Sequence, residues 1–510
     1  MASHYKWYPS SEEVVVPWNA RYAFPSQANK AVKMTPRIPP KNGGPFYPGG
    51  VIRMEFPAQG YVNTQNTTME FDVTLTGWSD TTDVSVTRFQ NNIQSIFSRA
   101  RLLYGSTPLE DIINYNVIVR ALTEWTATNQ EVTMDQTSVT EGIGGCVMGI
   151  TNGGTSQLMN TRQSVIQGID LTVATGTGYV PNQIDAFTNS TNLKACTRRY
   201  QINFAFGLFT QDKLLPTKFM ASQLAIELSL ANAASCIFTQ PATCVGTNPS
   251  YYVSNVNLIP EILEFDASYD AMFLKGLREG GVPIKFSSWH TYSFNPAGAS
   301  SLNLLIQERS RSVKAIFAVQ RASPDSIQKD SGALVFTSTA GTTLQQFQFR
   351  IGGRYFPSAP VQCSTSSGSA YSNGGAEAYV ELSKALNIVG DYRLSTGVNA
   401  FRWGMTYSNI TELGSVLLPI GESDYTIDIL KYGNTGTPSL QATSGTRASN
   451  VGSSCFAMAV NLETSSGVEI SGLNAEEQSD IALIAQYSGP QSAAYGIDVY
   501  TYYDAMVIVS

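Results

Sequence analysis

Apolar and polar residues alternate along much of this chain, and shorter segments of helical period interrupt the alternation. Residues 51–56 place an apolar side chain at every second position, and Met69, Phe71, Val73 and Leu75 do the same. Alternation of this kind predicts strands that bury one face. Further strand-like segments occupy residues 198–209, 223–234, 253–266, 284–294, 301–321, 344–356, 455–464, 480–488 and 497–509. The pattern therefore predicts an all-β protein with short helical insertions.

Helical spacing is concentrated in a few places. The apolar residues between Ile93 and Tyr104 recur every three or four positions, and a second such stretch follows Pro108. We therefore predict a helical insertion at about residues 91–125. Shorter helices are predicted at 269–277 and at about 376–387, the first ending at a pair of glycines.

The predicted elements group into two β-sandwiches. Residues 1–48 are rich in Pro, Gly and Asn without steady periodicity, which predicts an extended N-terminal arm. The first sandwich is predicted to span residues 49–283 and to contain a long, turn-rich loop at about 126–195. The helix at 269–277 bridges to a second sandwich, predicted at residues 284–510. The alternating last strand indicates that the C-terminal end lies in a sheet.

Charge bears on possible partners. Charged residues make up 14% of the chain, well below the usual quarter or so, and the net charge is −7. An acidic chain is not expected to be a general nucleic-acid binder, which would need basic groups to neutralise phosphates. The arm differs, because six basic residues oppose only Glu12 and Glu13, a balance of +4. The plain interpretation is a solvated tail.

Six basic residues are nevertheless candidates for an interface or a genome-facing surface. Four lie in the arm and two in the predicted helical insertion, where they could be plain surface charge or pair across a subunit boundary. The candidates are Lys30, Lys33, Arg37, Lys41, Arg99 and Arg101.

Residues that could support catalysis have simpler structural interpretations. The chain has two histidines, and His290 follows Trp289 in a strand pattern, which favours a hydrogen-bonded structural role. Glu264 and Asp266 would share one strand face, as a glycosidase pair could, but a solvated edge or an interface ion pair is the commoner origin of such a pattern. The glycines of EGIGGCVMG and ATGTGYV lack the spacing of a phosphate-binding loop. We predict no catalytic residue, cofactor or metal site.

The remaining signals concern cysteines and targeting. Six scattered cysteines without close spacing predict buried free thiols and folding in a reducing compartment. The first residues lack the apolar core of a signal peptide, and no apolar run reaches the length of a membrane span. We therefore expect a chain that is not secreted by this route and has no transmembrane segment.

Several segments, taken in order, resemble one viral protein family. They are EFPAQGYVNTQNTTMEFDVTL, FQNNIQSIFSRARLLYGSTPLED, GLFTQDKLLPTKF, FAMAVNLETSSGVEISGLNAEEQSDIALIAQYS and IDVYTYYDAMVIVS. Their succession, over most of residues 49–510, is similar to the major capsid proteins of polinton-like viruses and virophages, in the double jelly-roll lineage.

The resemblance implies two tandem jelly rolls and a structural role instead of an enzymatic one. Three chains would form a pseudo-hexagonal capsomer, and many such homotrimers would tile an icosahedral shell around double-stranded DNA without sequence-specific binding. Neighbouring capsomers, penton proteins and other minor capsid proteins are the implied partners. The virion is the implied location, after synthesis in the host cytoplasm and assembly there or in the nucleus. Residues 126–195, 358–375 and 433–455 are candidates for outward loops or capsomer contacts.

One alternative of another class remains open. Aromatic residues make up 11% of the chain, and tyrosines in exposed loops could form a sugar-binding platform. The chain would then be a receptor- or glycan-binding β-sandwich protein of a virus or phage fibre. Aromatic side chains also fill cores and subunit seams, which is the simpler explanation.

Overall fold

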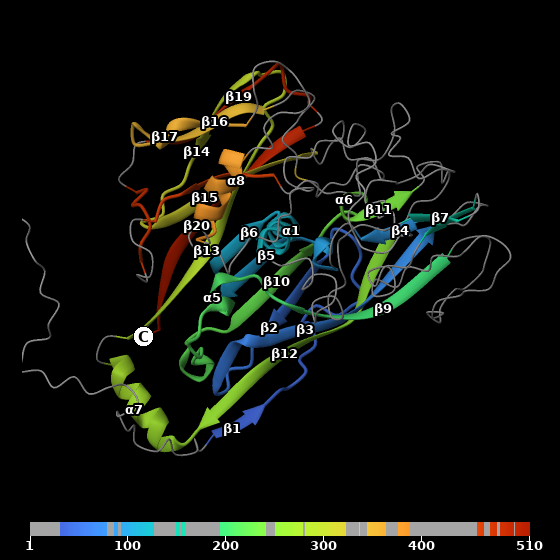
Figure 1. Cartoon of the computed structure of the whole chain (residues 1–510). Coiled ribbons are helices and arrows are strands. Elements are labelled where there is room, and N and C mark those ends of the chain that lie inside the picture. Colours follow the sequence, from blue (N-terminus) through green and yellow to red (C-terminus); the bar gives the residue numbers. More distant parts are fainter. Residues whose placement is uncertain are drawn as a thin grey trace, which may run out of the picture.

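The alternating segments form strands (Figure 1). These strands bury their apolar positions, as in β2 (Val51–Glu55), where Ile52 and Met54 are fully buried. The protein is represented by a computed structural model. It describes residues 31–78, 86–89, 93–126, 149–152, 155–158, 194–240, 250–278, 281–322, 336, 344–363, 376–387, 456–463, 470–476, 480–493 and 495–509.

Eight strands form the first sandwich, in two antiparallel sheets ordered β1-β12-β3-β9 and β2-β10-β5-β6. Aromatic rings connect the sheets: Phe71 of β3 packs edge-on against Phe97 of β5, with ring centroids 5.8 Å apart. The strands are β1 (Ala31–Met34), β2 (Val51–Glu55), β3 (Tyr61–Trp78), β5 (Phe97–Tyr104), β6 (Thr107–Ile113), β9 (Lys194–Asn203), β10 (Leu224–Leu230) and β12 (Ser250–Phe265).

The second sandwich repeats this topology, with sheets ordered β13-β20-β15-β18 and β14-β19-β16-β17. If the eight strands of each sandwich are counted in chain order, both sandwiches read 1-8-3-6 and 2-7-4-5. The strands are β13 (Val282–Phe294), β14 (Ser301–Ile306), β15 (Val313–Ala322), β16 (Leu344–Ile351), β17 (Arg354–Gln362), β18 (Met458–Asn461), β19 (Ile481–Tyr487) and β20 (Tyr495–Val509).

Smaller elements decorate the two sandwiches. Two-stranded sheets pair β4 (Val86–Phe89) with β11 (Ile237–Gln240) and β7 (Gly149–Asn152) with β8 (Thr155–Leu158). Most of the long loop predicted at 126–195 lies outside the described residues. The helical elements are η2 (Ile93–Ile96), α1 (Tyr115–Thr126), α5 (Gly207–Thr210), η3 (Thr217–Phe219), α6 (Ala233–Cys236), α7 (Ala267–Arg278) and α8 (Ala376–Ala385).

The helical insertion predicted at 91–125 is largely wrong. Among the described residues of this range, 93–125, only the turn η2 and the helix α1, which begins at Tyr115, are helical, and the strands β5 and β6 lie between them. Ala100 and Leu102 are buried, whereas Arg99 and Arg101 are partly exposed, so this segment has period two. The apolar residues at three- and four-residue spacing were misleading because Leu103, on the opposite side of the strand from Leu102, is buried as well.

The predicted boundary between arm and sandwich separates strands that belong together. β1 pairs with β12 from Ala31 opposite Phe265 to Met34 opposite Ile262. Farther along the chain, Phe46 makes an isolated bridge to Val253 of β12. Residues 31–48 are therefore part of the first sandwich, and its first strand lies ahead of the predicted start at residue 49.

Other predicted elements are confirmed. Helix α7 bridges the sandwiches, and α8 falls within the predicted 376–387. Strand β20 pairs with β13 along its length, up to Val509 opposite Val282, so the C-terminal end is held in a sheet (Figure 1).

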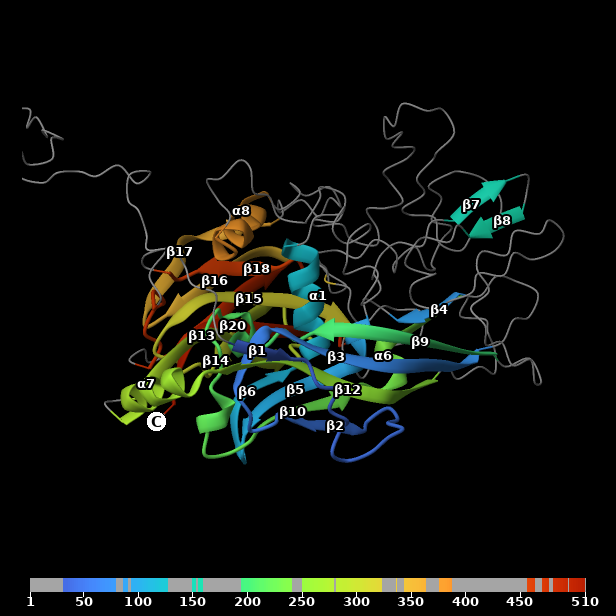
Figure 2. The same cartoon turned by 90° about the horizontal axis from the view of Figure 1, so that it is seen from below.

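Helix α1 belongs to the first half of the chain but packs against both sandwiches (Figure 2). Most of α1 is buried, and among its buried residues Val117, Ala121 and Trp125 lie four positions apart on one face. The Trp125 ring stacks on Phe317 of β15, with centroids 5.2 Å apart and planes 23° apart. Burial of this indole joins the cores of the two sandwiches.

Replacing Trp125 with Ala should lower the free energy of unfolding by about 3–5 kcal/mol, because it removes a fully buried aromatic side chain at the junction. Trp125→Phe keeps a ring against Phe317 and should cost less than half as much. Urea titration followed by circular dichroism measures both. Equal losses for the two variants would show that the stacked ring is not what stabilises this contact.

Candidate functional site

Opposite charges line the outer face of the sheet β2-β10-β5-β6. Arg53 of β2 lies opposite Glu227 of β10, which lies opposite Arg101 of β5, which lies opposite Asp111 of β6. Residues opposite one another in register share a face of the sheet, so these four side chains form a line of alternating sign. The buried residues Ile52 and Met54 flank Arg53 in sequence and point the other way.

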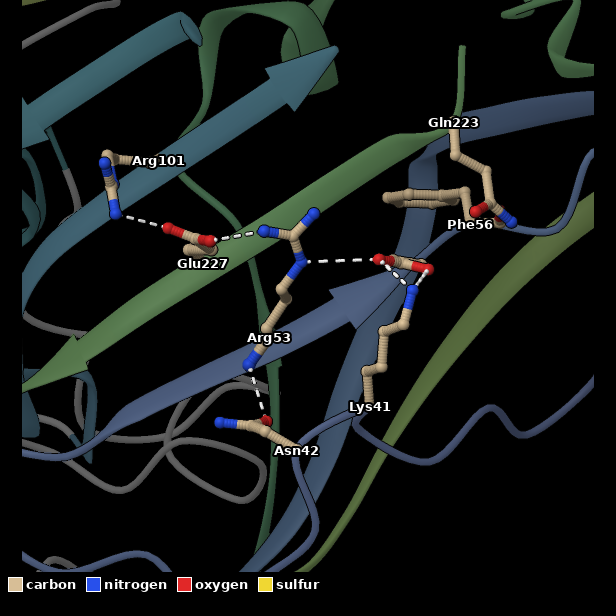
Figure 3. A network of polar contacts seen from close by, with 8 residues as sticks. Lys41, Asn42, Arg53, Phe56, Arg101, Gln223 and Glu227 are labelled. Atoms are coloured by element: carbon tan, nitrogen blue, oxygen red, sulfur yellow. Dashed lines mark hydrogen bonds and ion pairs between the residues drawn. The ribbon is translucent and has the colours of Figure 1, made fainter. Parts of the chain in front are cut away.

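Ion pairs connect these residues into a continuous chain, which we call the charged row: Lys41, Glu55, Arg53, Glu227 and Arg101 (Figure 3). Lys41 Nζ lies 2.8 Å from Glu55 Oε2, and Arg53 Nε lies 3.3 Å from Glu55 Oε1. Glu227 accepts a hydrogen bond from Arg53 Nη1 at 2.8 Å and another from Arg101 Nη2. One carboxylate thus holds two guanidinium groups from neighbouring strands.

Next to the row, Arg99 binds Asp111 through two parallel hydrogen bonds, of 2.7 Å from Nε and 2.5 Å from Nη2. Such bidentate pairing fixes the orientation of the guanidinium plane. The hydrogen bond to Asp111 raises the pKa of Arg99. Likewise, the hydrogen bond from Lys41 lowers the pKa of Glu55 against the opposing effect of burial. Pairs this exposed contribute only about 0–1 kcal/mol each, so they orient side chains more than they stabilise the fold.

A second set of carboxylates lies on the sheet β1-β12-β3-β9. Glu70, Asp72 and Glu261 are 6–8% exposed, because basic side chains lie over them. Hydrogen bonds from Arg199, at 2.8 Å from Nε, outweigh burial and lower the pKa of Asp72, with a further contribution from Asn255. Burial would raise the pKa of Glu261, but hydrogen bonds from Lys33, Asn66 and Asn63 outweigh it and lower that pKa.

The candidate residues of the arm take partners from both sheets. Lys33 pairs with Glu261 at 2.5 Å, Arg37 with Glu70 at 3.4 Å and Lys41 with Glu55 at 2.8 Å. Their side chains nevertheless stay 57–65% exposed. Lys30 lies outside the described residues. A genome-facing or interface role for these four residues stays a prediction.

Arg99 and Arg101 lie on a strand, and their predicted place on a helix is wrong. Both form ion pairs within the chain, and their side chains remain 39% and 35% exposed. Their acidic partners Asp111 and Glu227 were not among the residues predicted from the sequence. A period of two in residues 99–102 and 225–228 could have indicated both strands. It places Arg99, Arg101 and Glu227 on one face and apolar residues on the other.

His290 has a hydrogen-bonded position, as predicted from its strand context. Its Nδ1 lies 3.1 Å from Glu308 Oε2. Glu308 is buried and also accepts hydrogen bonds from Ser310 N at 2.9 Å, from Ser310 Oγ at 2.7 Å and from Thr501 Oγ1. Burial alone would raise the pKa of Glu308, but these donors, His290 first among them, lower it to about 2. The carboxylate serves as an internal hydrogen-bond acceptor.

The other candidates for chemistry also have structural partners. Asp266 accepts hydrogen bonds from Ala267 N at 2.8 Å and Ser268 Oγ at 3.2 Å where α7 begins, whereas Glu264 is exposed on β12 opposite Val32. Cys236 and Cys363 are buried free thiols, and burial raises the pKa of both. The other four cysteine side chains lie outside what the structure describes.

The described ranges contain neither a metal-ligand cluster nor a membrane-spanning helix. No group of three or more His, Cys, Asp or Glu side chains there is arranged to hold a metal ion. Among the helices of the same ranges, none is long and apolar enough to cross a membrane.

Comparison with known proteins gives structural matches only, since no family model and no curated protein matches the sequence. A chain of the Sputnik virophage structure is 12% identical, with a TM-score of 0.56 over 99% of this chain and 91% of that one. The Faustovirus major capsid protein is 10% identical, with a TM-score of 0.54 over 98% and 93%. This chain has the double jelly-roll fold. The mavirus major capsid protein agrees, at 9% identity and a TM-score of 0.50 over 100% and 93%. The predicted fold class, two tandem jelly rolls, is confirmed.

Glu308→Gln should destabilise the double jelly roll in a pH-dependent manner. Because the pKa of Glu308 is about 2 in the folded chain, against 4.5 ordinarily, its ionised form stabilises the fold above about pH 4.5. That contribution, about 3 kcal/mol, is lost as the pH falls towards 2. The difference in unfolding free energy between the wild type and the variant should therefore shrink between pH 5 and pH 3.

Urea titrations at pH 7, 5 and 3 measure this difference. The matched control is Glu264→Gln, which changes an exposed carboxylate without buried hydrogen-bond donors around it among the described residues and should leave only a small difference in unfolding free energy. A Glu308→Gln deficit of the same size at all three pH values would contradict the assignment of a lowered pKa.

Proposed function

We propose that this protein is a major capsid protein whose homotrimers form pseudo-hexagonal capsomers that tile an icosahedral shell around double-stranded DNA. The observation that carries the proposal is the repeated strand order, 1-8-3-6 and 2-7-4-5, in two sandwiches of one chain. The named structural neighbours, the major capsid proteins of Faustovirus and mavirus, support it.

Geometry explains why two fused sandwiches suit such a shell. Three chains related by a threefold axis place six similar wedges in a ring, so a trimer presents a nearly sixfold outline to its neighbours. The outline is regular only if both sandwiches of each chain keep a fixed relative orientation. The stacked pair Trp125 and Phe317 and the continuous core across the junction supply that rigidity.

The genome would be enclosed by shape more than by attraction. The chain carries a net charge of −7, and the basic residues of the charged row already have carboxylate partners in the same chain. Binding of DNA phosphates in bulk needs basic groups that can displace counterions. We therefore propose contact with DNA without sequence preference, and a structural role instead of an enzymatic one.

The proposal extends to partners and location. Capsomers would contact one another, penton proteins and other minor capsid proteins in the virion, after synthesis in the host cytoplasm and assembly there or in the nucleus. The long segments 126–195, 358–375 and 433–455 would supply outward loops or capsomer contacts. The exposed sides of Lys33, Arg37, Lys41, Arg99 and Arg101 are the candidate contact points on the described surface.

Purified protein should elute as a trimer of 55.2 kDa chains and appear as hexagonal particles in negative-stain electron microscopy. Light scattering coupled to size-exclusion chromatography measures the mass directly. A stable monomer that binds sugars on a glycan array would instead support the receptor-binding alternative.

Deletion of residues 1–30 tests the arm separately from the fold. The shortened chain keeps β1 and the pairs of Lys33, Arg37 and Lys41, so it should fold and form trimers but assemble particles at least several-fold less efficiently. Deletion of residues 1–45 is the comparison and should reduce stability as well, because it removes β1. Normal particle yield from the shorter deletion would rule out an assembly role for residues 1–30.

A further inference from the structure

A buried carboxylate lies where the two sandwiches meet. Glu110 of β6 is 1% exposed, although its neighbour Asp111 lies on the outer face. Alternation along β6 turns Glu110 inward, into a position that would ordinarily hold an apolar residue. A buried carboxylate is costly unless donors surround it, so its partners matter.

The donors come from both halves of the chain. Glu110 Oε2 accepts from Gly207 N at 2.8 Å and from Ser288 Oγ at 2.5 Å, and Glu110 Oε1 accepts from Leu208 N at 2.8 Å. Gly207 and Leu208 begin α5, which follows β9 of the first sandwich. Ser288 is fully buried on β13, the first strand of the second. The carboxylate therefore bridges the two sandwiches.

The backbone around this bridge fits tightly. A Cβ atom placed on Gly207 would lie 1.8 Å from the carbonyl oxygen of Ser287, so β13 passes at a distance that only glycine permits. The close approach sets how near α5 comes to β13. The hydrogen bond from Ser288 then fixes the position of β13 along its own direction.

We infer that Glu110 is a positioning residue that sets the orientation of the second jelly roll relative to the first. The inference itself concerns the single chain; only its consequence, a regular capsomer, rests on the proposed function. The buried carboxylate of Glu110 specifies one arrangement of the two sandwiches, a role that buried polar groups have in some other proteins.

Other junction contacts are less suited to this task. Thr291 Oγ1 donates to Ile113 O at 2.9 Å, and Asn114 Nδ2 donates to Ser293 Oγ at 3.1 Å, but both contacts are exposed to water. Asn114 Nδ2 also donates to Oδ1 of the buried Asp498, but at 3.3 Å and from a side chain that is itself only partly buried. Water can replace an exposed hydrogen bond at little cost. Loss of the Glu110 carboxylate would instead leave two backbone N–H groups and one hydroxyl buried without an acceptor, which is expensive.

The surroundings of Glu110 add a pH dependence. Tyr503 of β20 lies opposite Ser288, and the His290 ring stacks on Tyr503 with centroids 4.1 Å apart. His290 in turn contacts Glu308, and Asp504 accepts a hydrogen bond from Ser287 Oγ at 2.8 Å. Burial raises the pKa of Glu110 against the opposing effect of its three donors. Because the folded pKa is raised, the contribution of Glu110 to stability is full in acid and declines as the pH rises through that pKa.

Hydrogen exchange with mass-spectrometric detection, on the full-length protein, tests the inference at the bridging segments. In Glu110→Ala, peptides covering 204–210 and 284–292 should exchange about tenfold to a hundredfold faster than in the wild type, because the buried donors lose their acceptor. Calorimetry should show one unfolding transition splitting into two. The matched control is Glu227→Ala, which removes a carboxylate that accepts two hydrogen bonds, against three for Glu110, and lies on the outer face.

Two further variants keep the test decisive if Glu110→Ala does not fold. Ser288→Ala removes only the donor from the second sandwich and should speed exchange in the same two peptides, less strongly. Glu110→Gln keeps the size of the side chain but cannot ionise, so its exchange, corrected for intrinsic rates, should lack the change that the wild type shows as the pH rises above 4.5. The inference would be overturned if Ser288→Ala exchanged at the wild-type rate. It would also be overturned if Glu110→Gln kept the pH profile of the wild type.

The outcome is separable from that of the proposed function. If the wild type is a monomer while Glu110→Ala loosens these peptides, the capsid proposal fails and the positioning role stands. If the wild type forms trimers and the variants exchange normally, the positioning role fails alone.

Discussion

The constraint on which the rest of the structure depends is that two separate β-sandwiches must bury a shared surface. Each sandwich could satisfy its own strands by burying one face of each sheet. The junction between them has no such automatic solution, and this chain fills it with the aromatic side chain of Trp125 and the carboxylate of Glu110. Trp125 contributes buried apolar area, and the hydrogen bonds of Glu110 fix the relative orientation of the two sandwiches. A flexible junction would leave each sandwich folded, but the two sandwiches would have no fixed relative orientation.

Much of the fold could be predicted because strand alternation is local. The segments that became β2, β3, β10, β13 and β20 show their buried faces in the sequence itself. The segment from Ile93 to Ile113 does not show a single buried face in its sequence. Both sides of β5 are partly covered, so its apolar residues occur at spacings that are also typical of a helix. The first strand was missed for a related reason: β1 has only four residues and an exposed pattern, so its place is decided by pairing with β12.

The candidate site was less accessible to prediction than the fold. The sequence identified Lys33, Arg37 and Lys41 as unusually basic for this chain, but their partners lie up to 228 residues away, as Glu261 does from Lys33. Charge pairing across strands depends on register, which a single sequence does not reveal. Glu110 shows the same limit more sharply. In the sequence, Glu110 and Asp111 look like two neighbouring exposed acidic residues. Side chains alternate between the two faces of a strand, so recognising β6 as a strand would have placed Glu110 on the buried face, but the segment was predicted to be helical.

The two jelly rolls share a strand order but differ in what they display. In the first, strands seven, four and five carry Glu227, Arg101 and Asp111 in register on the outer face. In the second, the same strands carry amides instead: Gln346 donates to Gln486 at 2.8 Å and accepts from Gln362 at 3.0 Å. A jelly roll constrains its inner faces by packing and leaves its outer faces free to diverge.

That divergence bears on assembly. In a ring of six wedges built from three chains, charged and amide faces would alternate, so that each wedge is distinguishable from its neighbours although their backbones are alike. Charges at an interface determine which surfaces bind each other more than they increase the binding affinity. In the proposed capsomer, a chain that repeats its topology but varies its outer faces would combine nearly sixfold packing with contacts that still distinguish the two sandwiches, which two identical sandwiches would not provide.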